Sequence, residues 1–257
     1  MKIATYNAAS VRARLPLLVE WIAENEPDVL AIQETKVEDS KFPIDDFEEL
    51  GYHLCLHGQK SWNGVATLAR SLPTNMRQGF MDELMPIDAR LLTCQIDGVT
   101  IINTYVPNGG SVGSDKFEYK LRWLERFRRY LDENFRPTDP LIWLGDINIA
   151  PKPEDVYDSK RMYGMVGHHP EEFSRLGRIV EFGLVDIFRS MNQEPGQYTY
   201  WDFVIPNSVK RNLGWRIDHI YATESLAAKA TECTIDVDAR LQDKPSDHTF
   251  VVAEFNV

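Results

Sequence analysis

The sequence predicts an α/β fold made of one domain. Its 257 residues are 43% hydrophobic, which is enough for a single large core. The apolar run at residues 141–144 has the composition of a strand that is buried on both faces. Near the N-terminus, a segment with helical periodicity separates two strand-like segments, as in a βαβ unit. We therefore expect residues 1–257 to fold as one domain of strands and helices.

The composition restricts the compartment and the partners. Three well-separated cysteines without a Cys-Xaa-Xaa-Cys pair predict neither a disulfide framework nor a zinc site, and they favour the reducing cytoplasm. The sequence shows no signal-peptide pattern and no run of 18 uncharged apolar residues, so we expect no membrane partner. The net charge of −11 argues against an extensive nucleic-acid-binding surface. A small basic rim around an acidic centre would still guide a phosphate backbone.

The first βαβ unit consists of strands at residues 2–7 and 28–33 and a helix that begins at Leu15. Glu26-Pro27 ends this helix because proline cannot continue it. A crossover of this kind places Asn7 and Glu34 at the same edge of the sheet. Taken alone, Glu34 would also fit a solvated residue beyond a strand end.

The middle of the chain predicts antiparallel strands. Asn63-Gly64 is a turn signal between strands at residues 53–57 and 65–69. Asp97-Gly98 is the dipeptide of a two-residue hairpin, and it joins strands at residues 91–96 and 99–106. Tyr105 and Asn108 lie where the second of these strands ends.

A long helix is predicted at residues 115–134, where Trp123, Phe127 and Leu131 recur at every fourth position. One side of this helix is basic. Such a run is more often a solvated face, although its first turn could meet phosphates. The basic residues are Lys116, Lys120, Arg122, Arg126, Arg128 and Arg129.

The C-terminal half begins with a long loop. Residues 151–167 are rich in Pro, Asp and Gly and lack periodicity, and loops of this length are usually functional or mobile. A helix at residues 171–182 is stopped by Gly183, and residues 184–189 begin another element. Further strands are predicted at residues 198–203, 215–222, 231–236 and 250–255.

Polar side chains gather at the ends of the predicted strands. After the buried run 141–144, Gly145 allows a turn, and Asp146 and Asn148 point the same way on an extended chain. A carboxylate in this position can orient or deprotonate a water molecule, but Gly, Asp and Asn are also ordinary turn residues, and alone they favour a simple turn. The full set of strand-end residues is Asn7, Glu34, Tyr105, Asp146, Asn148, Asp218, Asp247 and His248.

Together these residues indicate a kind of site that none of them indicates alone. Carboxylates and amides are hard oxygen ligands, which suit Mg²⁺ or Mn²⁺ far better than zinc. An Asp paired with a His would hold the imidazole in position and favour its charged form, which could stabilise a phosphorane-like oxyanion.

The motifs around these residues resemble the exonuclease III family of apurinic/apyrimidinic endonucleases, in the endonuclease/exonuclease/phosphatase superfamily. They occur in order over nearly the whole chain, with the expected spacing. The resemblance implies a four-layer α/β sandwich, with two packed mixed β-sheets flanked by helices, as in pancreatic deoxyribonuclease. The motifs are Thr5-Tyr6-Asn7, Ile32-Gln33-Glu34-Thr35-Lys36, Trp62-Asn63-Gly64-Val65-Ala66, Tyr105-Val106-Pro107-Asn108-Gly109, Gly145-Asp146-Ile147-Asn148, Gly183-Leu184-Val185-Asp186, Tyr198-Thr199-Tyr200-Trp201, Gly214-Trp215-Arg216-Ile217-Asp218 and Ser246-Asp247-His248.

The resemblance also implies roles for the polar residues. Glu34 matches the principal metal ligand, with Asp247 near the metal, and Asp146 matches the group that activates the attacking water. His248, held by Asp218, matches the phosphate-binding histidine. The expected metal-binding set is Glu34, Asp146, Asn148, Asp247 and His248, and the expected catalytic set is Asn7, Tyr105, Asp146, Asn148, Asp218 and His248.

The substrate-binding residues are likewise implied by the resemblance. Tyr200, Trp215 and Ile217 match an apolar wall that accepts a flipped-out abasic sugar, although without the resemblance they would be taken as plain core. Asn108, Lys36 and Arg216 complete the expected substrate-binding set. Candidates for a basic rim that contacts DNA are Lys36, Lys116, Lys120, Lys210 and Arg216.

One position departs from the family pattern. Members carry Asn or Asp two residues after the first Asn, and this chain has Ala9 there. A methyl group can neither coordinate a metal nor hold a metal-bound water, so full activity is in doubt.

The implied function is that of a monomeric, Mg²⁺- or Mn²⁺-dependent DNA repair nuclease. It would cut duplex DNA 5′ to abasic sites and remove nucleotides or blocking groups from 3′ ends. The same fold also hosts inositol-phosphate phosphatases, sphingomyelinases and RNA deadenylases, so the fold alone proves no substrate. The alternative, motivated by Ala9, is a catalytically weak protein of this fold that binds damaged DNA without turnover.

Overall fold

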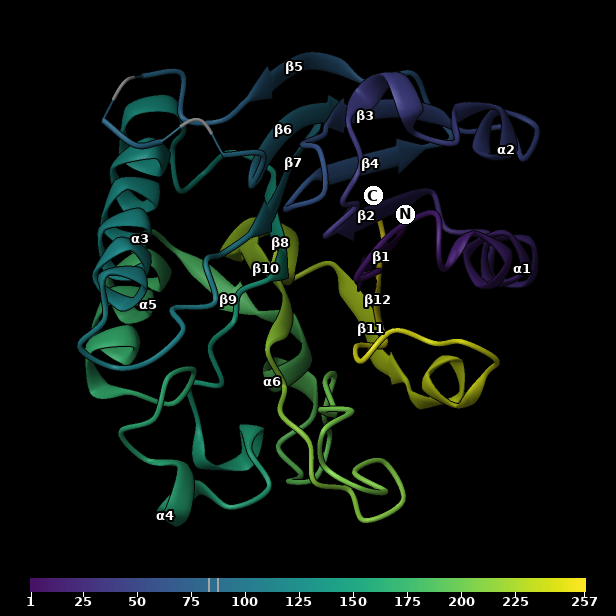
Figure 1. Cartoon of the computed structure of the whole chain (residues 1–257). Coiled ribbons are helices and arrows are strands. Elements are labelled where there is room, and N and C mark those ends of the chain that lie inside the picture. The colour runs from purple at the N-terminus through teal and green to yellow at the C-terminus, as the bar shows by residue number, and fades with distance from the viewer. Residues whose placement is uncertain (83, 87) are drawn as a thin grey trace.

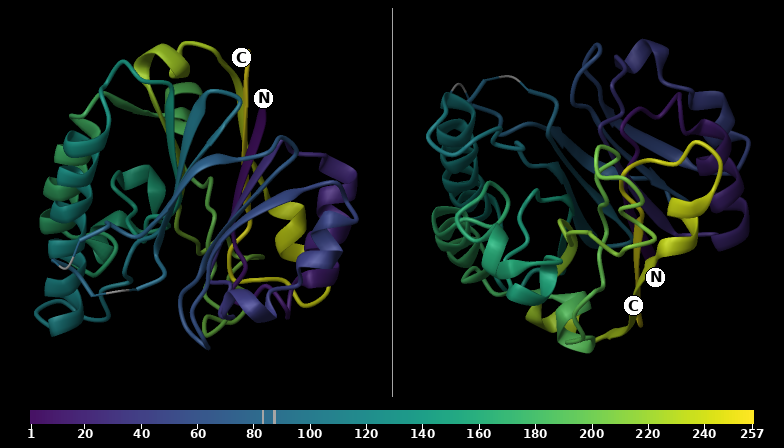
Figure 2. Two further views of the ribbon diagram at one scale, coloured as in Figure 1. Left: turned by 90° about the horizontal axis from the view of Figure 1, so that it is seen from above. Right: turned by 60° about the horizontal axis from the view of Figure 1, so that its bottom comes forward.

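The computed structural model describes residues 1–257 apart from Glu83 and Ile87, and two six-stranded mixed sheets lie face to face at its centre. Helices cover the outer face of each sheet, as the view from above shows (Figure 2). The predicted four-layer α/β sandwich is therefore confirmed.

The first sheet contains the parallel pair β1 (Lys2–Asn7) and β2 (Val29–Gln33), joined by α1 (Leu15–Asn25). Asn7 is aligned with Gln33, so Asn7 and Glu34 leave the sheet at the same edge, as predicted. The strand order is β11-β12-β1-β2-β4-β3, with β3 at His53–His57, β4 at Val65–Ala69, β11 at Ala230–Asp236 and β12 at Phe250–Phe255.

The second sheet has a matching parallel pair, β7 (Val99–Tyr105) and β8 (Leu141–Asp146), joined by α3 (Asp115–Asn134). Its predicted hairpin is confirmed, because Asp97 and Gly98 both adopt positive φ values, of 50° and 82°, between β6 (Leu91–Ile96) and β7. The strand order is β5-β6-β7-β8-β10-β9, with β5 at Thr74–Gln78, β9 at Leu184–Asp186 and β10 at Asp218–Thr223.

Three apolar layers hold the sandwich together. Side chains of β8 alternate between two of them: Ile142 and Leu144 pack between the sheets, whereas Leu141 and Trp143 pack under α3. The apolar stripe predicted on α3, which consists of Trp123, Phe127 and Leu131, packs in that outer layer. A third layer lies between the first sheet and α1 with α2 (Ile44–Glu48).

The remaining helices are short, except for α5 (Pro170–Val180), which lies beside α3 (Figure 1). They are α4 (Ser159–Met162), α6 (Ile187–Met191) and α7 (Glu224–Ala227). Among the described residues, no helix combines the length and the apolar character needed to cross a membrane.

Two C-terminal strand predictions need correction. Residues 198–203 form no regular strand, and the strand predicted from residue 215 begins at Asp218. The reason is that the backbone of Trp215 leaves the sheet and pairs with Tyr200, which in turn bridges to His248. Both segments thus turn over the edge where the polar strand ends meet. The sequence also missed β5, whose residues are all exposed and lack alternation, and the five-residue helix α2.

Candidate active site

The strand ends of both sheets meet in one pocket of about 470 Å³. Its polar side is lined by Glu34, Tyr105, Asn108, Asp146, Asn148, Asp247 and His248. Asn7 and Asp218 lie directly behind it, because each is buried and bonds to one of these residues. We refer to Asn7, Glu34, Tyr105, Asp146, Asn148, Asp218, Asp247 and His248 as the polar cluster.

Asn7 connects the two sheets at the base of the cluster. Its Nδ2 donates to Glu34 Oε1 at 2.9 Å and to Asp146 Oδ2 at 2.8 Å. Its Oδ1 accepts from the backbone N–H of Ala9, which fixes the direction of the amide. One carboxamide therefore sets the spacing between a carboxylate of the first sheet and a carboxylate of the second.

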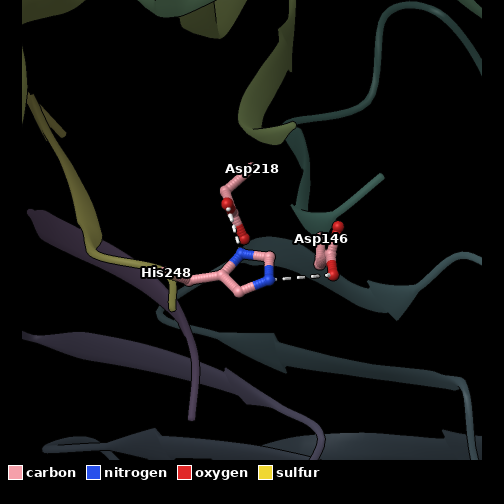
Figure 3. A group of neighbouring side chains, drawn as sticks. All are labelled: Asp146, Asp218 and His248. Carbon is pink, nitrogen blue, oxygen red and sulfur yellow. Dashed lines mark hydrogen bonds and ion pairs between the residues drawn. The ribbon is translucent and has the colours of Figure 1, made fainter. Parts of the chain in front are cut away.

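His248 lies between two aspartates (Figure 3). Its Nδ1 is 2.8 Å from Asp218 Oδ2, and its Nε2 is 3.8 Å from Asp146 Oδ2. Burial acts to lower the pKa of the imidazole, but the two carboxylates outweigh it and raise the pKa of His248 to about 10. At neutral pH this residue is an imidazolium, fixed by Asp218, with Nε2 directed toward the pocket side.

The pKa of Asp146 is also raised, but here burial is the main cause. Burial, reinforced by the charges of Asp218 and Glu34, raises the pKa of its carboxyl group to about 8, although His248 opposes the shift. Its Oδ1 accepts from the backbone N–H of Asn148 at 2.9 Å, so the carboxyl plane is fixed. In its ionised form, a carboxyl group with this raised pKa is a stronger base toward water than an ordinary aspartate.

Glu34 and Tyr105 differ in charge although they lie together. Burial acts to raise the pKa of Glu34, but the hydrogen bonds from Lys36 and Asn7 hold it below its ordinary value. Burial and the carboxylates of Glu34 and Asp146 raise the pKa of the Tyr105 phenol. Tyr105 is therefore a neutral donor beside an ionised glutamate.

Asn148 is held by its neighbours. Its Nδ2 donates to the carbonyl of Val106 at 2.9 Å, and its Oδ1 accepts from Asn108 Nδ2 at 3.2 Å. Its backbone is left-handed, with φ of 55°, a conformation that Asn adopts more readily than most residues. The sequence left a simple turn and a functional site as alternatives for the Gly-Asp-Xaa-Asn motif. The motif does turn, and its Asp146 and Asn148 both line the pocket.

The cluster has the donor chemistry of a divalent-metal site. Ligand atoms of Asp146, Asp218 and His248 lie within 4.8 Å of one another. Asp218 Oδ1 is buried and has no hydrogen-bond partner among the described residues. Because the imidazole is already bonded to Asp218, the oxygens that face the pocket are those of the carboxylates, which fits a hard cation.

Apolar side chains form a second part of the pocket lining, next to the polar cluster. Ile217, Val156 and Met162 are buried together, and Tyr200 and Trp215 pack against them. A Cβ atom on Gly167 would lie 3.3 Å from the Trp215 ring, so this backbone contacts the indole closely. We refer to Val156, Met162, Tyr200, Trp215 and Ile217 as the apolar wall.

Two predicted rim contacts are wrong. Arg216 is only 1% exposed, because its guanidinium is bonded to Asp155 Oδ1 and Asp186 Oδ2, each at 2.7 Å. Lys120 is fully buried and ion-paired with Glu172. Neither cation can reach DNA at the surface. Lys116 and Lys210 are exposed, and Lys36 is partly exposed with its ammonium 2.8 Å from Glu34.

Sequence reasoning missed part of the pocket. Met165, Val166 and Gly167 line it beside Trp215, although the sequence predicted only a loop there. The one available signal was His169-Pro170 followed by Glu172, which forms a capping box at the start of α5 and fixes where the preceding loop ends. Ala9 is present at the edge of the cluster with a left-handed backbone, at φ of 48°.

Comparisons with known proteins agree with this geometry. The model of the "Endonuclease/Exonuclease/phosphatase family" matches residues 4–248. Exodeoxyribonuclease III from Haemophilus influenzae is 34% identical over 266 residues, covering 99% of this chain and 100% of that protein. An AP endonuclease from Archaeoglobus fulgidus has a TM-score of 0.96 and 40% identity, with 100% of both chains covered. A 3′ phosphatase from Neisseria bound to a product DNA hairpin has a TM-score of 0.94 and 34% identity, also with 100% of both chains covered.

The resemblance in motifs, the four-layer fold and the full-length similarity therefore agree. The chain belongs to the endonuclease/exonuclease/phosphatase family and, within it, to the exonuclease III family of apurinic/apyrimidinic endonucleases.

Proposed function

We propose that this protein is a divalent-metal-dependent DNA repair nuclease that cuts duplex DNA 5′ to abasic sites and removes nucleotides or blocking groups from 3′ ends. The observation that carries the proposal is that the polar cluster and the apolar wall line the same pocket. Its relatives include an exodeoxyribonuclease III, an AP endonuclease and a 3′ phosphatase.

The family depends on divalent metals, and the acidic cluster fits such an ion. We propose Mg²⁺ or Mn²⁺, held by Glu34, Asp146 and Asp247, with Asn148 as a further predicted ligand. The predicted ligand role of His248 does not fit, because an imidazolium has no free lone pair for a cation. When bound, the cation would neutralise negative charge on the phosphate.

The protein's own residues divide the remaining work. Asp146 orients the water and accepts its proton, and Asn7 keeps that carboxylate in place. The His248 imidazolium, fixed by Asp218, donates to a phosphate oxygen on which charge develops. The neutral phenol of Tyr105 and the amides of Asn108 and Asn148 supply further donors to the phosphate.

Selection of abasic DNA is proposed to come from the apolar wall. The pocket of about 470 Å³ must hold the phosphate as well as the sugar. Tyr200, Trp215 and Ile217 line part of it with apolar surface, which suits a flipped-out sugar without a base. Extruding an abasic sugar is also easier because no base pair has to be broken.

The test is a nicking assay with a labelled duplex that carries one abasic site. We expect a cut 5′ to that site with Mg²⁺, none with a chelator, and slower digestion of an undamaged duplex with a recessed 3′ end. A 3′-phosphate duplex in the same assay reports removal of blocking groups. Absence of cleavage at every Mg²⁺ and Mn²⁺ concentration would contradict the proposal.

The second candidate function is damage binding with little turnover, and Ala9 is the observation that favours it. The two functions separate in the same experiment. A damage-binding protein would retard abasic duplex in a gel more strongly than undamaged duplex and would leave both intact.

Other expectations stay predictions. These are the single-domain organisation of residues 1–257, the monomeric state and the cytoplasmic location. The buried free thiols of Cys55, Cys94 and Cys233 are compatible with a reducing compartment.

A further inference from the structure

The ammonium group of Lys120 lies immediately behind the polar cluster. It is fully buried in α3, and its Nζ donates to the carbonyl oxygen of Asn148 at 2.7 Å and to that of Asn108 at 3.2 Å. Its third partner is the carboxylate of Glu172 in α5, which is also fully buried. One cation thus binds the backbone of the two loops that present Asn108 and Asn148 to the pocket.

Glu172 extends this connection to the apolar wall. Its Oε2 accepts from the backbone N–H groups of Gly167 at 2.8 Å and His169 at 3.1 Å. Gly167 lies against the indole of Trp215, and its carbonyl accepts from Ala150 N–H at 2.7 Å. The ion pair therefore joins three loops that line the pocket, at residues 106–110, 146–150 and 165–169.

The packing around Lys120 leaves little freedom. A Cβ atom on Gly109 would lie 3.1 Å from Lys120 Cδ and 3.1 Å from Val166 Cγ1. The lysine stem is thus enclosed between the first and the third of these loops. A change in the position of the ammonium would displace both sides of the pocket together.

Stability alone does not explain such a pair. Taking two charges out of water is costly, and apolar or neutral replacements of buried pairs are often neutral or stabilising. The benefit that remains is geometric, because a cation with three fixed acceptors defines the distances between the loops that carry them.

We propose that Lys120 and Glu172 are positioning residues that set the polar cluster and the apolar wall at their working separation. This rests on the proposed nuclease function. Neither side chain lines the pocket, so they act through Asn108, Asn148 and Gly167. Loss of the pair should lower turnover and also weaken the preference for an abasic site.

The test uses neutral replacements of similar shape. Lys120→Met/Glu172→Gln removes both charges together and leaves no uncompensated buried charge. Glu172→Gln alone is more severe, because it leaves the Lys120 ammonium buried without its counter-charge, and one amide oxygen cannot replace both carboxylate oxygens. The matched control is Arg126→Met, since Arg126 lies in the same helix and loses ion pairs with Asp82 and Glu133 that do not involve the pocket.

We expect the double variant to have a kcat on abasic duplex that is ~10-fold to 100-fold lower, with KM changed by less than about threefold, because small misplacements of catalytic groups are costly. The preference for abasic over undamaged duplex should also fall, and Glu172→Gln should show at least as large a loss of both. Arg126→Met should keep the parental kcat and preference. Equal kcat losses in the double variant and in Arg126→Met would overturn the proposal.

Hydrogen exchange supplies a measurement that does not depend on nuclease activity. In the double variant and in Glu172→Gln, backbone amides at residues 106–110, 146–150 and 165–169 should exchange faster, whereas those of α1 should not change. Unchanged exchange in these loops would overturn the positioning role. Failure of the proposed function would be seen separately, as a parent protein that does not cleave abasic DNA.

Discussion

The polar cluster and the apolar wall line one pocket and adjoin at His248 and Tyr200, but they are built differently. Asn7 is the last residue of β1 and Asp146 is the last residue of β8, and each of these strands has a parallel neighbour in its own sheet. Asp218 is the first residue of β10 and pairs with Asp146. The wall lies outside both sheets: Val156, Tyr200 and Trp215 are joined by isolated bridges, and Met162 lies in α4. Half of the polar cluster is thus fixed in strands, whereas no residue of the wall is.

This difference predicts which substitutions change the cleavage rate and which change the preference among substrates. Asp146 is held by backbone pairing on both sides, with Tyr105 and with Asp218, so a substitution there changes chemistry without moving the scaffold. Loop residues are held by fewer contacts, and loops vary most readily between related proteins. We therefore expect cluster substitutions to change the rate on all substrates, and wall substitutions to change the preference among them.

The largest effect is expected from Asp146→Asn. The variant keeps the shape of the side chain but removes the group that accepts the proton from water, so the cleavage rate should fall by at least ~10²-fold. The affinity for abasic duplex should stay nearly the same. Single-turnover kinetics beside a binding titration measures both quantities. A variant that cuts at the parental rate would exclude Asp146 from the mechanism.

Ala9→Asn should act in the opposite direction. It adds one oxygen donor at the edge of the cluster, and it should lower the Mg²⁺ concentration for half-maximal cleavage by ~10-fold to 100-fold, as expected for a supporting ligand. Mn²⁺ should help the parent more than this variant. A metal titration of abasic-site cleavage gives the result.

The control for that titration is Ala9→Gly. Residue 9 has a φ of 48°, which Gly and Asn tolerate better than Ala, so both replacements relieve the backbone. Only Asn adds a donor. Superimposable titration curves for Ala9→Asn and Ala9→Gly would show that position 9 does not serve the metal.

A change in the wall should alter selection. Trp215→Leu removes part of the surface that excludes a base, so the ratio of abasic to undamaged cleavage should fall by about tenfold, a typical value for a modest change in an apolar pocket. Tyr163→Leu is the control, because Tyr163 is 63% exposed and does not line the pocket. Competition between the two duplexes in one tube measures the ratio. An unchanged ratio in Trp215→Leu would remove this residue from selection.

The smallest effect is expected at the rim. Lys116→Ala and Lys210→Ala should each weaken DNA binding several-fold and lower the slope of log affinity against log salt by about 1, if each lysine contacts one phosphate. Lys229→Ala is the control, since Lys229 is exposed near the chain termini, at the opposite end of β1 from Asn7. Affinities that do not depend on salt would contradict electrostatic binding at the rim.

The comparison also explains what the sequence could predict. Asn7 and Glu34 were predicted to lie together because parallel pairing of β1 and β2 brings their ends to one edge. Asp146 was predicted because it ends a clearly patterned strand, but it is the packing of the two sheets that brings it to that edge. The bend of residues 198–203 over that edge was not found, because an aromatic run looks the same in a strand and in a loop with single bridges.

The partners of single buried charges were equally beyond the sequence. Arg216 has the local pattern of a surface cation, whereas Lys120 falls on the helix face that carries Trp123 and Phe127. Their partners Asp155 and Glu172 are far away along the chain, 61 residues in the case of Arg216, and only the packing of the layers brings them together. Local periodicity contains no information about such pairs.

The central claim is that chemistry and selection reside in two different sets of residues that line the pocket. The most direct test compares the parent, Asp146→Asn and Trp215→Leu in single-turnover cleavage of two duplexes that differ only in the presence of one base. Asp146→Asn should lower both rates by the same factor, and Trp215→Leu should lower mainly the ratio between them. If Asp146→Asn changed the ratio while Trp215→Leu lowered both rates equally, the assignment of the two sets would be contradicted.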